Sequence, residues 1–196
     1  MKFAPRSACL LAALLLVAGP CLHAAEVRSP DGRISVTVDV GTGGIPQYSM
    51  SYRGVIVMPA GNLGFRFQAQ PAFDQGSRFA GSAHASHDGT WEQPWGERRW
   101  VRDHYNELWV RFESAGGAAR RFDLRLRVFD DGFGFRYEVP EQPGYADVNI
   151  TDELTEFRLD HEPETTACGI PGRRYNRYEY LYQTTSLDAI HMAHTP

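Results

Sequence analysis

The chain has 196 residues, of which 42% are hydrophobic and 22% charged, and its formal net charge is −4. This length suits one domain with a single buried core. The acidic balance and the lack of a block of basic residues argue against a nucleic-acid partner. Beyond the first residues, no segment is long and apolar enough to predict a membrane-spanning helix, so we expect no membrane partner.

The first 24 residues have the pattern of a bacterial secretory signal peptide. Lys2 and Arg6 form a basic start, and residues 9–19 form an apolar run that is too short to span a bilayer comfortably. Small residues then precede the expected cleavage point after Ala24. We therefore expect a periplasmic or secreted protein whose mature domain covers residues 25–196.

The first part of the mature chain predicts a series of short strands. Residues 33–40 alternate apolar and polar side chains, which is typical of a half-buried antiparallel strand. Residues 47–52 and 55–59 flank a turn at residues 53–54, and this arrangement predicts a hairpin. Residues 63–69 predict another short strand.

The middle of the chain is less regular. Residues 71–90 are polar and rich in glycine, which indicates a long excursion or an irregular strand. Residues 97–103 and 106–114 predict two further strands. The clearest hairpin covers residues 121–140, and the sequence Asp-Asp-Gly at 130–132 is expected to supply a left-handed turn conformation.

The last part of the chain completes the prediction of fold class. Residues 148–159 predict one strand with a kink, and residues 178–187 predict another. About ten short strands with turn signals between them, and no helix longer than a turn or two, predict an all-β fold: an antiparallel β-sandwich of the supersandwich type. The final residues, HMAHTP, read as the middle of a connection, so we expect the sandwich to be incomplete at its C-terminal end.

Residues 91–108, WEQPWGERRWVRDHYNEL, are dense in tryptophan, glutamate and arginine. Indole rings are suited to stacking on sugar rings, and the candidates are Trp91, Trp95 and Trp100. Carboxylates are suited to acid and base roles, and the candidates here are Glu92, Glu97 and Glu107.

The same segment fits a structural interpretation, which we favour. In that interpretation the tryptophans lie in the core, while neighbouring charges pair on a strand surface. The expected pairs join Arg98, Arg99 and Arg102 to Glu97, Asp103 and Glu107. An acid/base pair is defined by separation in space, which the spacing in sequence does not single out.

Two pairs of histidines with a spacing of three do not predict a zinc site. His84 and His87 lie in the weakly patterned stretch, and His191 and His194 lie near the last residue. Neither pair has an evident third ligand, so we interpret all four as solvated side chains. The sequence also lacks a phosphate-binding loop and a nucleophile elbow.

Glu179 stands among tyrosines in the segment RYNRYEYLYQTT, residues 174–185. One interpretation is an ion pair with a nearby arginine, namely Arg173, Arg174 or Arg177. The other is a metal ligand, because hard cations bind carboxylate oxygens from separate parts of a structure. A single glutamate is too few for calcium, so the remaining ligands have to come from elsewhere.

Five segments, in order, resemble the amino-terminal domain of glycoside hydrolase family 97: SPDGRISVTVDV, WEQPWGERRWVRDHYNELWVRF, LRVFDDGFGFRYEVP, ITDELTEFRL and RYNRYEYLYQTTSL. The resemblance runs from Val27 to the last residue. It implies a secreted bacterial enzyme of the α-glucosidase or α-galactosidase type. Such an enzyme has an amino-terminal β-supersandwich, a (β/α)8 barrel and a small carboxy-terminal β domain.

The resemblance also implies where the chemistry lies. The catalytic carboxylates sit on the barrel, which needs roughly 250 residues, so we predict no catalytic residue in this chain. The α-linked oligosaccharide substrate is then bound through the absent barrel. By the same resemblance the sandwich packs on the barrel, and Glu179 is one ligand of a calcium ion. The alternative is a stand-alone carbohydrate-binding sandwich that uses the tryptophans of residues 91–100.

Overall fold

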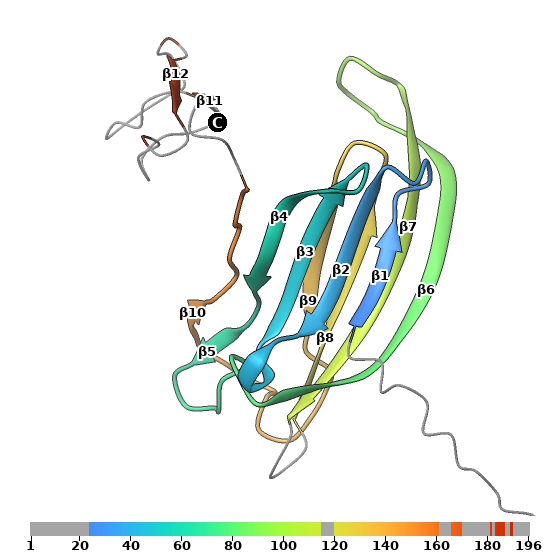
Figure 1. The fold of residues 1–196 in the computed structure, drawn as a ribbon. Coiled ribbons are helices and arrows are strands. Elements are labelled where there is room, and N and C mark those ends of the chain that lie inside the picture. Colours follow the sequence, from blue (N-terminus) through green and yellow to red (C-terminus); the bar gives the residue numbers. More distant parts are fainter. Residues whose placement is uncertain are drawn as a thin grey trace, which may run out of the picture.

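Two antiparallel four-stranded sheets lie face to face in the computed structural model (Figure 1), which describes residues 24–114, 120–160, 166–169, 181, 183–186 and 189. The first sheet has the order β1-β2-β3-β4, with β1 at Ala24–Arg28, β2 at Ile34–Val40, β3 at Pro46–Tyr52 and β4 at Val55–Asn62. The second has the order β6-β7-β8-β9, with β6 at Ser77–Glu92, β7 at Trp100–Ser114, β8 at Arg121–Val128 and β9 at Phe133–Glu138. The predicted all-β sandwich is therefore confirmed.

Smaller elements complete the described part of the chain. A short pair joins β5 (Phe65–Phe67) to β10 (Ile150–Glu153), and another joins β11 (Thr166–Gly169) to β12 (Gln183–Ser186). A 3-10 turn, η1, lies at Thr42–Gly44. None of the described helical residues forms a helix long and apolar enough to cross a membrane.

The core lies between the inner faces of the two sheets. Every second residue of β2 and of β7 points inward, and Val36, Val38, Leu108 and Val110 are completely shielded from solvent. Phe112 and Phe122 stack across β7 and β8 with ring centroids 5.0 Å apart. Removing such apolar area from water is the main source of stability for a sandwich of this kind.

The two predicted hairpins form, but only one turn has the expected backbone. Arg53 and Gly54 both have positive φ angles, 52° and 82°, so the turn twists with the strands β3 and β4 that it joins. Between β8 and β9, Gly132 does not take a left-handed conformation, so that prediction is wrong. A hydrogen bond of 2.8 Å from the Phe129 amide to the Gly132 carbonyl closes that turn.

The largest departure from the predicted elements is β6. The weakly patterned segment is a strand of 16 residues that pairs with β7 along its whole length, with one bulge near Gly81. Most of its side chains are exposed on both faces, so β6 lacks the alternation that marks a half-buried strand. The two strands predicted over 97–114 are a single strand, β7, which begins at Trp100.

The strand predicted over 148–159 is regular only in β10. After it, the backbone amides of Leu154, Glu156 and Asp160 each donate a 2.9 Å hydrogen bond, to the carbonyl oxygens of Gly64, Asn62 and Val57 in turn. Asn62 and Val57 belong to β4, the edge strand of the first sheet. This stretch therefore covers the edge of β4, which an open sheet would leave unpaired. Of the strand predicted over 178–187, residues 183–186 form β12, and residues 178–180, 182 and 187 lie outside the described residues.

Candidate functional site

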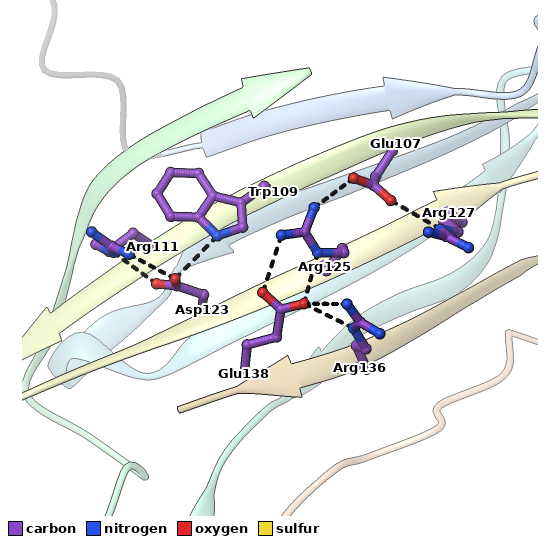
Figure 2. A network of polar contacts seen from close by, with 8 residues as sticks. All are labelled: Glu107, Trp109, Arg111, Asp123, Arg125, Arg127, Arg136 and Glu138. Atoms are coloured by element: carbon purple, nitrogen blue, oxygen red, sulfur yellow. Dashed lines mark hydrogen bonds and ion pairs between the residues drawn. The ribbon is translucent and has the colours of Figure 1, made fainter. Parts of the chain in front are cut away.

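The outer face of the second sheet carries a network of charged side chains on β7, β8 and β9 (Figure 2). Alternation along each strand sends apolar residues into the core and these charged residues outward. The antiparallel register then brings charges of three strands together. The network consists of Glu107, Trp109, Arg111, Asp123, Arg125, Arg127, Arg136 and Glu138.

Glu107 lies at one end of this network and is only 9% exposed. Its two oxygens accept hydrogen bonds from Nη1 of Arg125 at 2.6 Å and from Nε of Arg127 at 2.9 Å. Partial burial acts to raise the pKa of Glu107, but the two guanidinium groups outweigh it and hold the pKa below its usual value. Glu107 is therefore ionised at neutral pH and is not poised to act as a general acid.

Arg125 links Glu107 to Glu138 on β9. It donates from Nε and Nη2 to the two oxygens of Glu138 at 2.7 and 3.1 Å, a bidentate arrangement. Arg125, with help from Arg136, holds the pKa of Glu138 below its usual value. In return, the two carboxylates raise the pKa of Arg125.

Asp123 forms the second part of the network and is 4% exposed. Its oxygens accept two 2.8 Å hydrogen bonds from Arg111 and one of 3.1 Å from the indole nitrogen of Trp109. Arg111 also lies over the Trp109 ring, 4.7 Å from its centroid. All six carboxylate oxygens of Glu107, Asp123 and Glu138 are thus paired, which is the arrangement of a rigid scaffold.

The pairs that the sequence predicted around residues 97–107 do not form. Arg99 pairs with Glu92 at 2.8 Å, and Arg102 pairs with Asp88 through two bonds of 2.9 and 2.8 Å. Glu107 takes its partners from β8. The spacing in sequence does not single out Arg125 and Glu138 as network partners, although the charges at every second position of RLRV and FRYE indicate one charged face.

The tryptophans of residues 91–100 are exposed, so their predicted place in the core is wrong. Trp91, Trp95 and Trp100 keep 48%, 80% and 58% of their surface in contact with solvent. They lie at the β6–β7 end, which extends beyond the neighbouring strands (Figure 1). The two sheets do not overlap there, so no core exists for these rings to enter.

The described residues hold no group of three or more His, Cys, Asp and Glu side chains that could bind a metal ion. His87 lies 3.7 Å from Asp103 and packs on Tyr105, its neighbour across the strands, and His84 is exposed. Glu179, His191 and His194 lie outside the described residues. The metal-ligand role of Glu179 stays a prediction.

The described residues define a class of protein: an antiparallel β-sandwich domain with a paired network of charges on the outer face of one sheet. Residues 27–196 match the family described as Glycosyl-hydrolase 97 N-terminal. The chain therefore belongs to this family.

Solved structures agree with that assignment. A family 97 glycoside hydrolase from Pseudoalteromonas sp. strain K8, a variant in complex with panose, is 39% identical with a TM-score of 0.78. That match covers 84% of this chain and 25% of the other. The acarbose complex of an enzyme from the same strain gives 40% identity and a TM-score of 0.77, over 83% of this chain and 24% of that one.

A beta-arabinopyranosidase is more distant, with 26% identity and a TM-score of 0.66 over 76% of this chain and 23% of its own. This chain thus spans about a quarter of the length of the solved enzymes that it matches.

Proposed function

We propose that this chain is the non-catalytic amino-terminal sandwich of a secreted, calcium-dependent α-glycosidase. In this proposal it packs on a (β/α)8 barrel and lends that barrel a metal-ligand glutamate, Glu179. The observation that carries the proposal is the family match over residues 27–196, combined with coverage of only a quarter of the matched enzymes. The complexes of those relatives with panose and acarbose support an α-linked oligosaccharide as the substrate of the whole enzyme.

The calcium part of the proposal needs ligands in addition to Glu179. Calcium takes six to eight oxygen ligands, and the described residues contain no cluster of three candidate side chains. One glutamate contributed to a site completed by the barrel fits that donor set. Bound calcium would act there as a Lewis acid that polarises the scissile region and positions the leaving group.

The first experiment reads the nucleotides beyond codon 196 and measures the intact mass of the native protein. The proposal expects a much heavier protein with a (β/α)8 pattern, and an amino terminus from which residues 1–24 have been removed. The expected cleavage point lies at the start of β1, so at most one residue of that strand is lost. A stable product of the mature size, 172 residues, would refute the proposal that this chain is part of a larger enzyme.

Activity and metal binding give the second test. The full chain alone is expected neither to hydrolyse nitrophenyl α-glycosides nor to bind calcium in a titration. In the larger enzyme, Glu179→Gln is expected to weaken calcium binding, whereas a substitution of exposed Glu97 leaves it unchanged. Hydrolysis by the chain alone would show that catalysis resides in the sandwich.

A second candidate function, a stand-alone carbohydrate-binding module, is favoured by the exposure of Trp91, Trp95 and Trp100. This candidate predicts that the full chain binds malto- or galacto-oligosaccharides, and that Trp95→Ala weakens the binding. Calorimetric titration with maltotriose separates the two candidates.

A further inference from the structure

The end of the β6–β7 hairpin is an aromatic arm, which we define as residues 91–100. It extends beyond the ends of the neighbouring strands (Figure 1). Its three tryptophans are 48%, 80% and 58% exposed, and Trp95 near its turn is the most exposed of them. Tryptophan and arginine are enriched at the centres of protein interfaces, and exposed apolar surface of this kind marks a contact site.

The arm presents aromatic surface on both of its faces. In the register of β6 and β7, Trp91 lies opposite Val101, and Glu92 lies opposite Trp100. Residues directly opposite each other share a face, and successive residues alternate. Trp91 and Trp100 therefore lie on opposite faces. A platform that stacks several rings on a sugar needs those rings on one face. An arm with rings on both faces can bury all of them only if a partner contacts both faces.

The arm is held in shape before any partner is bound. The Gln93 amide donates a 2.7 Å hydrogen bond to the Arg99 carbonyl, which closes the base of the turn. The Arg99 side chain pairs with Glu92 at 2.8 Å, and its guanidinium lies over the Trp100 ring, 5.5 Å from the centroid. Such preorganisation reduces the entropy that is lost when the arm docks.

We propose that the aromatic arm inserts into the catalytic part of the family 97 polypeptide, with Trp95 as the central anchor. This inference rests on the function proposed above. The occupant follows from chain length: the matched part covers only 25% and 24% of two of the solved enzymes, so most of their polypeptide lies outside it. The arm also carries charges of both signs beside its rings, Glu92 and Glu97 with Arg98 and Arg99, which suits a protein wall with a mixed polar rim.

The test fuses the full chain in frame in place of the matching quarter of the Pseudoalteromonas sp. strain K8 enzyme. Protease cleavage at the junction measures how often the two parts separate, because cleavage tracks the open population. Hydrolysis of a nitrophenyl α-glycoside is measured on the same samples. Trp95→Ala is expected to raise the junction cleavage rate about thirtyfold, the effect of losing one interfacial hot spot. The matched control is Ile150→Ala, an exposed apolar residue of β10 (54% exposed), which is expected to leave the rate unchanged.

Each outcome decides between explanations. If the intact fusion is active and Trp95→Ala behaves like Ile150→Ala, the sandwich docks by another surface, and the proposal for the arm is wrong while the proposed function stands. If the intact fusion is inactive and its junction is cleaved freely, the proposed function fails and the arm proposal fails with it. Two measurements on the full chain alone identify other occupants. A dimer that Trp95→Ala dissociates would assign the arm to a second copy, and maltotriose binding that Trp95→Ala removes would assign it to sugar.

Discussion

Replacing Glu107 by glutamine tests whether the outer network of the second sheet stabilises the fold. The substitution keeps the size of the side chain but removes the charge that pairs with Arg125 and Arg127. The two pairs are not equivalent. The side chain of Arg125 is 29% exposed and that of Arg127 is 45% exposed, while that of Glu107 is 11% exposed.

The magnitude follows from these exposures and from what each arginine keeps. Breaking a fully buried pair costs about 3–5 kcal/mol because a charge is left unpaired. Arg125 avoids that penalty because it keeps its bidentate bonds to Glu138. A charged hydrogen bond at such a half-buried site contributes about 1.5 kcal/mol, and the more exposed pair with Arg127 contributes about 0.5 kcal/mol. Glu107→Gln is thus expected to lower the free energy of unfolding by about 2 kcal/mol, or Tm by about 4–8 °C.

Double-mutant cycles in urea unfolding, followed by tryptophan fluorescence, measure the two pairs separately. One cycle combines Glu107→Gln with Arg125→Met, and the other combines it with Arg127→Met. The coupling energy of Glu107 with Arg125 is expected to exceed that with Arg127. The reasoning is refuted if the order is reversed, or if Glu107→Gln alone changes stability by less than about 0.5 kcal/mol, as a substitution at an ordinary surface site does.

Three further predictions concern the core, a close backbone contact and a buried tyrosine. Leu124→Ala empties a site with no exposed surface, and calorimetry is expected to show a loss of about 3–4 kcal/mol. Gly64→Ala places a Cβ 2.1 Å from the Phe73 carbonyl oxygen and is expected to lower the free energy of unfolding by at least about 2 kcal/mol. Gly54→Ala, also at positive φ but in open space, is expected to lower it by about 1 kcal/mol. Chemical unfolding compares the two variants. Burial raises the pKa of Tyr137 to about 12, so the folded state holds this proton more tightly than the unfolded state. The stabilisation that the protonated Tyr137 gives the folded state is complete below pH 10 and is lost as the pH rises toward 12. The difference in the free energy of unfolding between the wild type and Tyr137→Phe is expected to shrink over that window.

The parts of the fold that follow from the sequence are those in which one face of a strand is buried. Residues 33–40 and the hairpin over 121–140 alternate strictly because one face packs into the core, and their strands form as predicted, although the turn at Gly132 does not. The strand β6 has no such constraint. Most of its side chains are in solvent on both faces, so small and polar residues occur on both and leave no period to detect.

The pairing of charges was mispredicted for a different reason. The sequence suggests partners that are close along the chain, and Arg98, Arg99 and Arg102 lie within nine residues of Glu107. In the sheet, the neighbours of Glu107 are set by the register of β7 with β8, so its partners are 18 and 20 residues away. The exposure of the tryptophans also cannot be predicted from the local sequence, because a pattern of residues does not indicate which end of a hairpin lies outside the sandwich.

In the proposed enzyme the sandwich and the barrel have different roles, which follow from the outer network and from the aromatic arm. The described carboxylates of the outer network accept hydrogen bonds from arginines on all their oxygens, so they are held as fixed, paired charges. The rigid sheet instead fixes the base of the aromatic arm, because β6 and β7 stay paired from the core to the turn. In the proposed enzyme such a domain would contribute position: it would place an anchor such as Trp95, and the proposed metal ligand Glu179, against a partner that supplies the chemistry. Stiffness of the paired strands is then the property on which its function depends, and substitutions that loosen the register of β6 on β7 are expected to impair the whole enzyme without touching its catalytic residues.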